Sequence, residues 1–168
     1  MSTYLITGAS RGIGQALSLR LSKDGHEVLA IARDAGALQA LEKECGCRVL
    51  AFDLERPDWD VFREWVGSHS PLDGMIHNAG FLKSTAFMEL DAELVKRHYE
   101  INVLSAFGLF QAVLPHASIQ AHFLTIGTIG GMTGSSKFPG LSAYSSSKAA
   151  LSTLTECLQV EFPERNWT

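Results

Sequence analysis

The sequence predicts an α/β fold, a three-layer sandwich in which a parallel sheet is covered by helices on both faces. Short apolar runs rich in β-branched or aromatic residues alternate with amphipathic segments along the chain. The strand candidates are apolar almost throughout, as strands buried on both faces are. With 168 residues, 46% of them hydrophobic, the chain suits one core. We therefore expect a single domain over residues 1–168.

Five strands and five helices are expected in alternation. The predicted strands are the short apolar runs Tyr4–Thr7, Glu27–Ala32, Arg48–Phe52, Leu72–His77 and His122–Thr128. The predicted helices are the amphipathic segments 13–22, 35–44, 58–68, 91–115 and 143–161. In the third helix an aromatic and aliphatic stripe recurs at helical spacing, which predicts a core face rather than a cofactor contact: Trp59, Phe62, Trp65 and Val66.

Charge and hydropathy exclude several partner classes. Charged residues make up 19% of the chain and sum to a net charge of −4, so no basic face is available for nucleic acid or for a membrane surface. The longest apolar stretch, Ile101–Ile126, is interrupted by polar residues and predicts a buried helix plus a strand rather than a membrane span. Strand-like sequence begins at Thr3, without a preceding signal segment, and this predicts a cytoplasmic protein.

Cysteine and histidine usage predicts no metal site. Cys45, Cys47 and Cys157 are odd in number, suit a reducing compartment and are expected to be structural. The six histidines share no ligand-like spacing with one another or with cysteine.

A glycine-rich turn follows the first predicted strand. It reads Thr7-Gly8-Ala9-Ser10-Arg11-Gly12-Ile13-Gly14 and leads directly into a helix. Glycines permit positive φ and a close backbone approach, while the free N–H groups and the dipole of the helix start attract a pyrophosphate. A tight βα turn would explain three glycines equally well, but the strand-turn-helix context favours a dinucleotide-binding loop.

The end of the second predicted strand bears on the choice of cofactor. A site that prefers NAD commonly places an acid there for the ribose 2′-hydroxyl, whereas this chain has Arg33. Arg11, within the glycine turn, supplies a second cation for a 2′-phosphate. Both arginines can also be read as solvated surface charges, since Asp34 adjoins Arg33. We expect NADP(H) to be preferred over NAD(H).

Tyr144 and Lys148 form a pair at the start of the last predicted helix. A spacing of four residues places the phenol and the ammonium on one face of the helix, one turn apart. Tyrosine has a pKa near 10, and a nearby cation favours its phenolate. The pair is therefore a candidate for general acid-base catalysis, although Tyr-x-x-x-Lys also occurs as an ordinary exposed helix pair.

Together, the glycine turn and the Tyr-x-x-x-Lys helix resemble the short-chain dehydrogenase/reductase family, and the match runs from Thr3 to Phe162. The resemblance implies a Rossmann-like three-layer sandwich with a parallel sheet, and hydride transfer between a nicotinamide and a small carbonyl or alcohol substrate. It also implies a homodimer or homotetramer packed through the helices at 91–115 and 143–161.

The resemblance assigns roles to particular residues. The implied cofactor contacts are Gly8, Ser10, Arg11, Gly12, Ile13, Gly14, Arg33, Asp53, Asn78, Ala79, Gly80, Tyr144 and Lys148. The implied catalytic residues are Asn102, Thr128, Tyr144 and Lys148. Asp53 would contact the adenine ring and Asn102 would hold a water in a proton relay, while His77, where the family has asparagine, is expected to be structural.

The catalytic hydroxyl departs from the family pattern. The family places a serine after the fifth strand, and here that position is Thr128. Threonine keeps a hydroxyl that can polarise a substrate carbonyl. Ser142, nearer to Tyr144 in the sequence, ranks a distant second.

The resemblance further implies strands and a substrate-covering loop after the Tyr-x-x-x-Lys helix, and the sequence ends at Thr168 without them. We therefore expect the fifth strand to lie at an uncovered sheet edge. Two functional hypotheses remain: a shortened carbonyl reductase with an open substrate side, or a dinucleotide-binding or dimer-forming module with little turnover.

Overall fold

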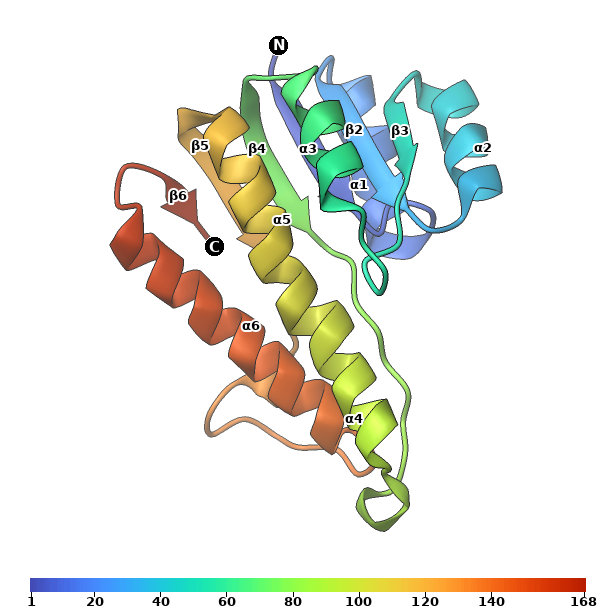
Figure 1. Cartoon of the computed structure of the whole chain (residues 1–168), viewed down its shortest axis with the longest axis vertical. Coiled ribbons are helices and arrows are strands. Elements are labelled where there is room, and N and C mark those ends of the chain that lie inside the picture. The colour runs from blue at the N-terminus through green and yellow to red at the C-terminus, as the bar shows by residue number, and fades with distance from the viewer.

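The computed structural model describes residues 1–168 and contains a six-stranded parallel sheet between two layers of helices (Figure 1). The strand order is β3-β2-β1-β4-β5-β6, the order of the Rossmann fold. The strands are β1 (Thr3–Thr7), β2 (Glu27–Ala32), β3 (Arg48–Ala51), β4 (Leu72–His77), β5 (Ala117–Thr125) and β6 (Asn166–Trp167). The predicted fold class is confirmed.

Helices cover both faces of the sheet. They are α1 (Gly12–Lys23), α2 (Ala35–Cys45), α3 (Trp59–Gly67), α4 (Ala92–Tyr99), α5 (Ser105–Val113) and α6 (Ser142–Glu161). Short 3-10 turns lie at Phe87–Glu89, Leu114–His116 and Ile129–Gly131. In Figure 1, α3, α5 and α6 lie in front of the sheet, and α5 and α6 run side by side past the ends of its strands. None of these helices is both long and apolar enough to cross a membrane.

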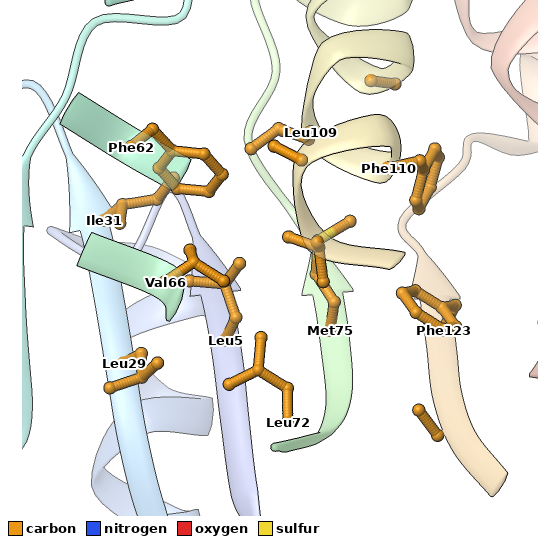
Figure 2. Close-up of a cluster of buried hydrophobic side chains, with 14 of the residues drawn as sticks. Leu5, Leu29, Ile31, Phe62, Val66, Leu72, Met75, Leu109, Phe110 and Phe123 are labelled. Carbon is orange, nitrogen blue, oxygen red and sulfur yellow. The ribbon is translucent and has the colours of Figure 1, made fainter. Parts of the chain in front are cut away.

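The two faces of the sheet form two separate apolar clusters, because successive strand residues point to opposite sides. On β1, Leu5 joins a cluster of 18 buried residues, while Ile6 joins a cluster of 8. The larger cluster lies between the sheet and the helices α3, α5 and α6, and Figure 2 shows Phe62, Phe110 and Phe123 within it. The smaller cluster is covered by α1 and α2.

The predicted core stripe on α3 is confirmed. Phe62 and Val66 are fully buried, and Trp59 and Trp65 are partly buried against the same cluster. Trp59 packs so closely on α5 that a Cβ at Gly108 would overlap its indole ring. Trp59 therefore holds α3 against α5.

The helix predicted over 91–115 is interrupted in the structure. Between α4 and α5 the chain forms a π-helical turn, Glu100–Leu104, and the buried Asn102 lies within it. An extra residue in one helical turn shifts the faces of the helix on either side, and such turns often occur at functional sites. The helical run ends in a 3-10 turn at Pro115, whose ring cannot be accommodated within an α-helix interior.

The fifth strand differs from the prediction in its bounds and in its surroundings. β5 begins at Ala117 and ends at Thr125, three residues before Thr128, because the Ile126 carbonyl turns toward Lys148. The expectation of an uncovered edge is wrong, since β6 pairs with β5 in parallel and the Trp167 ring stacks on Phe123 at 4.5 Å. A two-residue strand is too short for the alternation that sequence patterns reveal.

Candidate functional site

A pocket of about 830 Å³ lies at the carboxyl ends of the sheet, where parallel α/β proteins bind their ligands. It opens beside the point where the chain direction around the sheet reverses, between β1 and β4. Ten of the predicted cofactor residues line it: Gly8, Ser10, Arg11, Gly12, Ile13, Arg33, Asp53, Asn78, Ala79 and Gly80. Lining residues that sequence reasoning missed include Phe52, Glu55, Phe81 and Ile101.

The conformation of the glycine turn depends on the absence of a Cβ atom at its glycines. Gly8 and Gly12 have φ values of 68° and 59°, in the region that favours glycine. A Cβ at Gly14 would overlap the Gly8 carbonyl and lie 2.6 Å from the Asn78 amide nitrogen. No side chain caps the first N–H groups of α1, and its first two residues, Gly12 and Ile13, line the pocket. The turn thus fits a pyrophosphate, which needs free N–H donors and close backbone approach.

Thr7 joins this turn to the end of β4. Its hydroxyl oxygen accepts hydrogen bonds from the backbone N–H groups of Asn78 and Ala79 at 3.1 and 2.9 Å. The Asn78 amide in turn donates to the carbonyls of Thr7 and Gly8. Asn78, predicted as a cofactor contact, therefore also braces the glycine turn from the end of β4.

The Thr7 hydroxyl fixes the state of His77. Because the oxygen accepts two N–H groups, its own hydrogen is directed to Nδ1 of His77, 3.1 Å away. The neutral ring must then carry its hydrogen on Nε2, which is buried and has no partner. Burial, and then the charge of Lys148, lower the pKa of His77 to about 3. His77 is therefore a neutral support at the end of β4.

Arg33 follows β2 directly and lines the pocket, as the sequence predicts. Its side chain is 59% exposed, and its guanidinium lies 3.8 Å from the carboxylate of Glu55. Glu55 is a neighbour that sequence reasoning missed. Because parallel strands end at one edge of the sheet, its place two residues after Asp53, just past β3, could have indicated it.

Lys148 lies at the far end of the same region. Its side chain is buried, and Nζ donates to the Ile126 carbonyl at 2.8 Å. A Cβ at Gly80 would lie 3.3 Å from Nζ and 3.4 Å from Oδ1 of Asn102, so these three residues meet where the pocket lining ends. Burial lowers the pKa of Lys148 to about 8.

Tyr144 occupies the first turn of α6, one turn before Lys148. Burial raises the pKa of its phenol above the usual value of 10. The expected lowering by Lys148 does not occur in this structure, and burial, which penalises the phenolate, is the cause of the shift. At neutral pH Tyr144 carries its proton and can act as a donor.

Asn102 ties the loop after β4 to α6. Its Oδ1 accepts the Phe81 N–H at 2.7 Å, and its Nδ2 donates to the Phe81 carbonyl at 3.0 Å and to the Ser147 hydroxyl at 2.9 Å. One turn earlier, Nε2 of His98 accepts the Lys83 N–H at 3.3 Å. Phe81, Ser147 and His98 carried no recognisable signal in the sequence, because their roles depend on contacts between residues far apart in the chain.

Thr128 lies after β5, beside the start of α6. A Cβ at Gly130 would lie 4.0 Å from the Thr128 hydroxyl oxygen and 2.8 Å from that of Ser145, so both hydroxyls flank Gly130. Ser142 is exposed at the first residue of α6. Ser145, the residue after Tyr144, is therefore a second hydroxyl near Thr128.

The strand order, the glycine turn and the pocket at the strand ends define a Rossmann-type α/β protein. The family model for short chain dehydrogenases matches residues 2–167. The chain belongs to this family, whose members are oxidoreductases that use a nicotinamide cofactor.

Similar proteins agree with this assignment. The chain is 31% identical over 158 residues to carbonyl reductase [NADPH] 2 of Sus scrofa, covering 94% of this chain and 64% of that protein. It is 30% identical to D-erythrulose reductase of Gallus gallus, covering 94% and 63%. The chain spans less than two thirds of the length of these curated relatives.

Solved structures show the same fold. A short-chain dehydrogenase from Streptomyces avermitilis superposes with a TM-score of 0.86 at 27% identity, covering 98% of this chain and 62% of that one. A short-chain dehydrogenase from Escherichia coli CFT073, complexed with NADPH, gives 0.87 at 25% identity, covering 98% and 73%.

Proposed function

We propose that the chain is an NADP(H)-dependent oxidoreductase that transfers a hydride between the nicotinamide and a small carbonyl or alcohol substrate. One observation carries the proposal: Tyr144 and Lys148 lie one helical turn apart on α6, and Lys148 meets Gly80 at the end of the glycine-turn pocket. A proton donor and a dinucleotide pocket are thereby joined in one region.

Different residues of the pocket would bind different parts of the cofactor. The N–H groups at the start of α1 would hold the pyrophosphate, and Asp53 the adenine side. Asn78, Ala79 and Gly80 would line the ribose, and the Lys148 ammonium would bind the nicotinamide ribose. When bound, the nicotinamide supplies or accepts the hydride.

Tyr144 would exchange the proton at the substrate oxygen. Because burial raises its pKa, the phenol is protonated at neutral pH and suits donation to a carbonyl that is being reduced. The Thr128 hydroxyl would polarise the same oxygen. Lys148 would resupply the proton, and Asn102, held by Phe81 and Ser147, would position the loop and a relaying water beside it.

The preference for NADP(H) rests on Arg11 and Arg33, which line the pocket as its cations. Guanidinium groups bind phosphate through paired N–H donors, which a 2′-hydroxyl does not need. The names of two similar proteins point the same way, a carbonyl reductase [NADPH] and a structure complexed with NADPH.

The test is turnover of NADPH with a panel of small ketones and aldehydes, followed by the absorbance of reduced nicotinamide. We expect Tyr144→Phe to lose at least about a hundredfold in kcat while NADPH still binds, because general acid catalysis contributes about 10²–10⁴-fold. Tyr4→Phe, at the start of β1 beside His26, serves as the matched control and should keep full activity.

Two results would contradict the proposal. Equal rates in wild type and Tyr144→Phe would remove Tyr144 from the chemistry. NADPH binding without turnover of any carbonyl would favour the second hypothesis, a module that binds a dinucleotide without catalysis.

A further inference from the structure

Three charged side chains from separate elements meet at the end of the pocket formed by β2 and β3. Oε2 of Glu55 lies 3.8 Å from the Arg33 guanidinium and 3.0 Å from NH2 of Arg97. Arg33 follows β2, Glu55 follows β3, and Arg97 lies on α4. The carboxylate therefore sits between two cations and lines the pocket together with one of them.

Glu55 differs from the other two carboxylates that line this end of the pocket. Asp34 accepts the Ala37 N–H and caps α2, and Asp53 accepts the Glu55 N–H within a tight turn. Both are engaged with the backbone. Glu55 instead pairs with arginine side chains, so its charge acts on the group that would receive a 2′-phosphate.

Arg97, which does not itself line the pocket, holds the Glu55 carboxylate in place through their ion pair. The Arg97 guanidinium lies 4.5 Å from the centre of the Phe81 ring, and Phe81 is bound in turn to Asn102. The Glu55 side chain is 27% exposed, less than half the exposure of Arg33. Glu55 is therefore the partner held by a second contact, with Arg97, and Arg33 is the more exposed one, so we expect the carboxylate to stay at the pocket if Arg33 turns toward a ligand.

A carboxylate held beside Arg33 weakens the binding of an anion there in two ways. It competes with the anion for the guanidinium, and it repels the anion directly through Coulomb interaction. A neutral 2′-hydroxyl experiences neither effect. The net effect of Glu55 depends on whether the nucleotide carries a phosphate at this position.

We infer that Glu55 is a specificity-determining residue, which weakens binding of nucleotides with a 2′-phosphate while leaving those with a free 2′-hydroxyl unchanged. The inference rests on the proposed function, because it assumes that the adenosine ribose lies at Arg33. It makes the chain less selective for NADP(H) than its two arginines alone would suggest.

The experiment compares two small probes, adenosine 2′,5′-bisphosphate and AMP, which differ only in the 2′-phosphate. Their dissociation constants are measured by calorimetry for wild type and Glu55→Gln at low salt. We expect Glu55→Gln to bind the bisphosphate about three- to tenfold more tightly and AMP within about twofold of wild type. The gain should shrink as salt is added, because exposed charges are screened.

The matched control is Glu27→Gln. Glu27 also lies 3.8 Å from an arginine, Arg48, with a side chain that is 34% exposed, but it does not line the pocket. It should change neither affinity. In an Arg33→Gln background the gain from Glu55→Gln should fall, because much of it depends on freeing Arg33.

The outcomes separate the two claims. If AMP binds but Glu55→Gln leaves the bisphosphate affinity unchanged, lowers it, or shifts both ligands equally, the inference fails while the nucleotide pocket stands. If wild type binds neither probe, the proposed function fails and the inference fails with it.

Discussion

The two ends of the pocket region differ in which atoms form them, backbone atoms at one end and side chains at the other. At the glycine turn the contacts are backbone atoms, and the shape depends on side chains that are missing at Gly8, Gly12 and Gly14. At the α6 end, the proposed chemical groups are the side chains of the buried Lys148 and the partly buried Tyr144, and burial changes the pKa values of both. One end should therefore respond to steric change and the other to pH.

The two ends meet through Thr7 and the end of β4. The Thr7 hydroxyl binds the N–H groups that follow β4 and also His77, whose pKa is lowered in part by Lys148. The effect of a steric change in the glycine turn can thus be compared with the effect of a charge change near α6 in the same protein.

The largest expected effect is steric and belongs to the turn. Gly14→Ala places a methyl group against the Gly8 carbonyl and the Asn78 amide, and neither can retreat without opening the turn. We expect at least about a tenfold loss of NADPH affinity, together with a decrease of about 1–3 kcal/mol in the free energy of unfolding. Fluorescence titration and urea unfolding measure the two quantities.

Gly36→Ala is the matched control for Gly14→Ala. It makes the same substitution in the first turn of α2, where the nearest atom to a Cβ is the Asp34 carboxylate at 3.5 Å, an ordinary contact. It should leave binding unchanged and raise stability by about 0.4–1 kcal/mol. Equal effects of the two substitutions would show that the turn is not sterically constrained.

The second effect is electrostatic and belongs to Lys148. The unfolded chain keeps this proton up to a pH near 10.5, whereas the native lysine gives it up near 8. Between these values the unfolded state binds more protons, so raising the pH favours the native state. We expect a gain of up to about 3 kcal/mol in unfolding free energy across this range.

Urea unfolding at a series of pH values tests this gain. Lys148→Met, which keeps the length of the side chain without its charge, should lack the rise, and the exposed Lys23→Met should retain it. Parallel profiles for wild type and Lys148→Met would contradict the burial of a charge at this end.

The smallest of the three effects belongs to His77. The unfolded histidine takes up a proton near pH 6.5, but the buried ring resists it until about pH 3. Acidification through this window therefore favours the unfolded state, and the native state should lose about 2 kcal/mol between pH 6.5 and about pH 5. His77→Asn should remove this loss.

Nitrogen NMR of the ring gives a direct readout. His77 should stay neutral at about pH 5, with its hydrogen on Nε2, as the bonding of Thr7 requires. A ring that titrates near pH 6, or carries its hydrogen on Nδ1, would contradict this assignment.

The sequence predicts the regular parts of the fold closely. The observed β2 and β4 have the predicted bounds, because both are apolar runs flanked by turn residues. The π-helical turn at Asn102 was not predicted, since it arises from bonds to Phe81 and Ser147 that lie 21 and 45 residues away. β6 was missed because two residues show no periodicity, and only its pairing with β5 and the stacking of Trp167 on Phe123 identify it.

The sequence predicts the part of the site formed by backbone atoms more completely than the part formed by side chains. The glycine turn could be found from local spacing, because its requirements are conformational and lie within eight residues. Ser145 could not, because its place beside Thr128 depends on a contact between α6 and the loop at Gly130. The position of Glu55 just past β3 could indicate that it lies at the pocket, but not that it pairs with Arg33 and Arg97. The sequence predicts that Lys148 lowers the pKa of Tyr144, but burial raises this pKa in the structure. The burial could not be predicted, because it depends on packing that no short motif encodes.

The most direct test of the account is a titration of the chain with NADPH, followed by nicotinamide fluorescence, for wild type, Gly14→Ala and Tyr144→Phe. We predict saturable binding by wild type, nearly equal affinity for Tyr144→Phe, and strongly weakened binding for Gly14→Ala. Absence of saturable NADPH binding by wild type, or full affinity in Gly14→Ala, would contradict it.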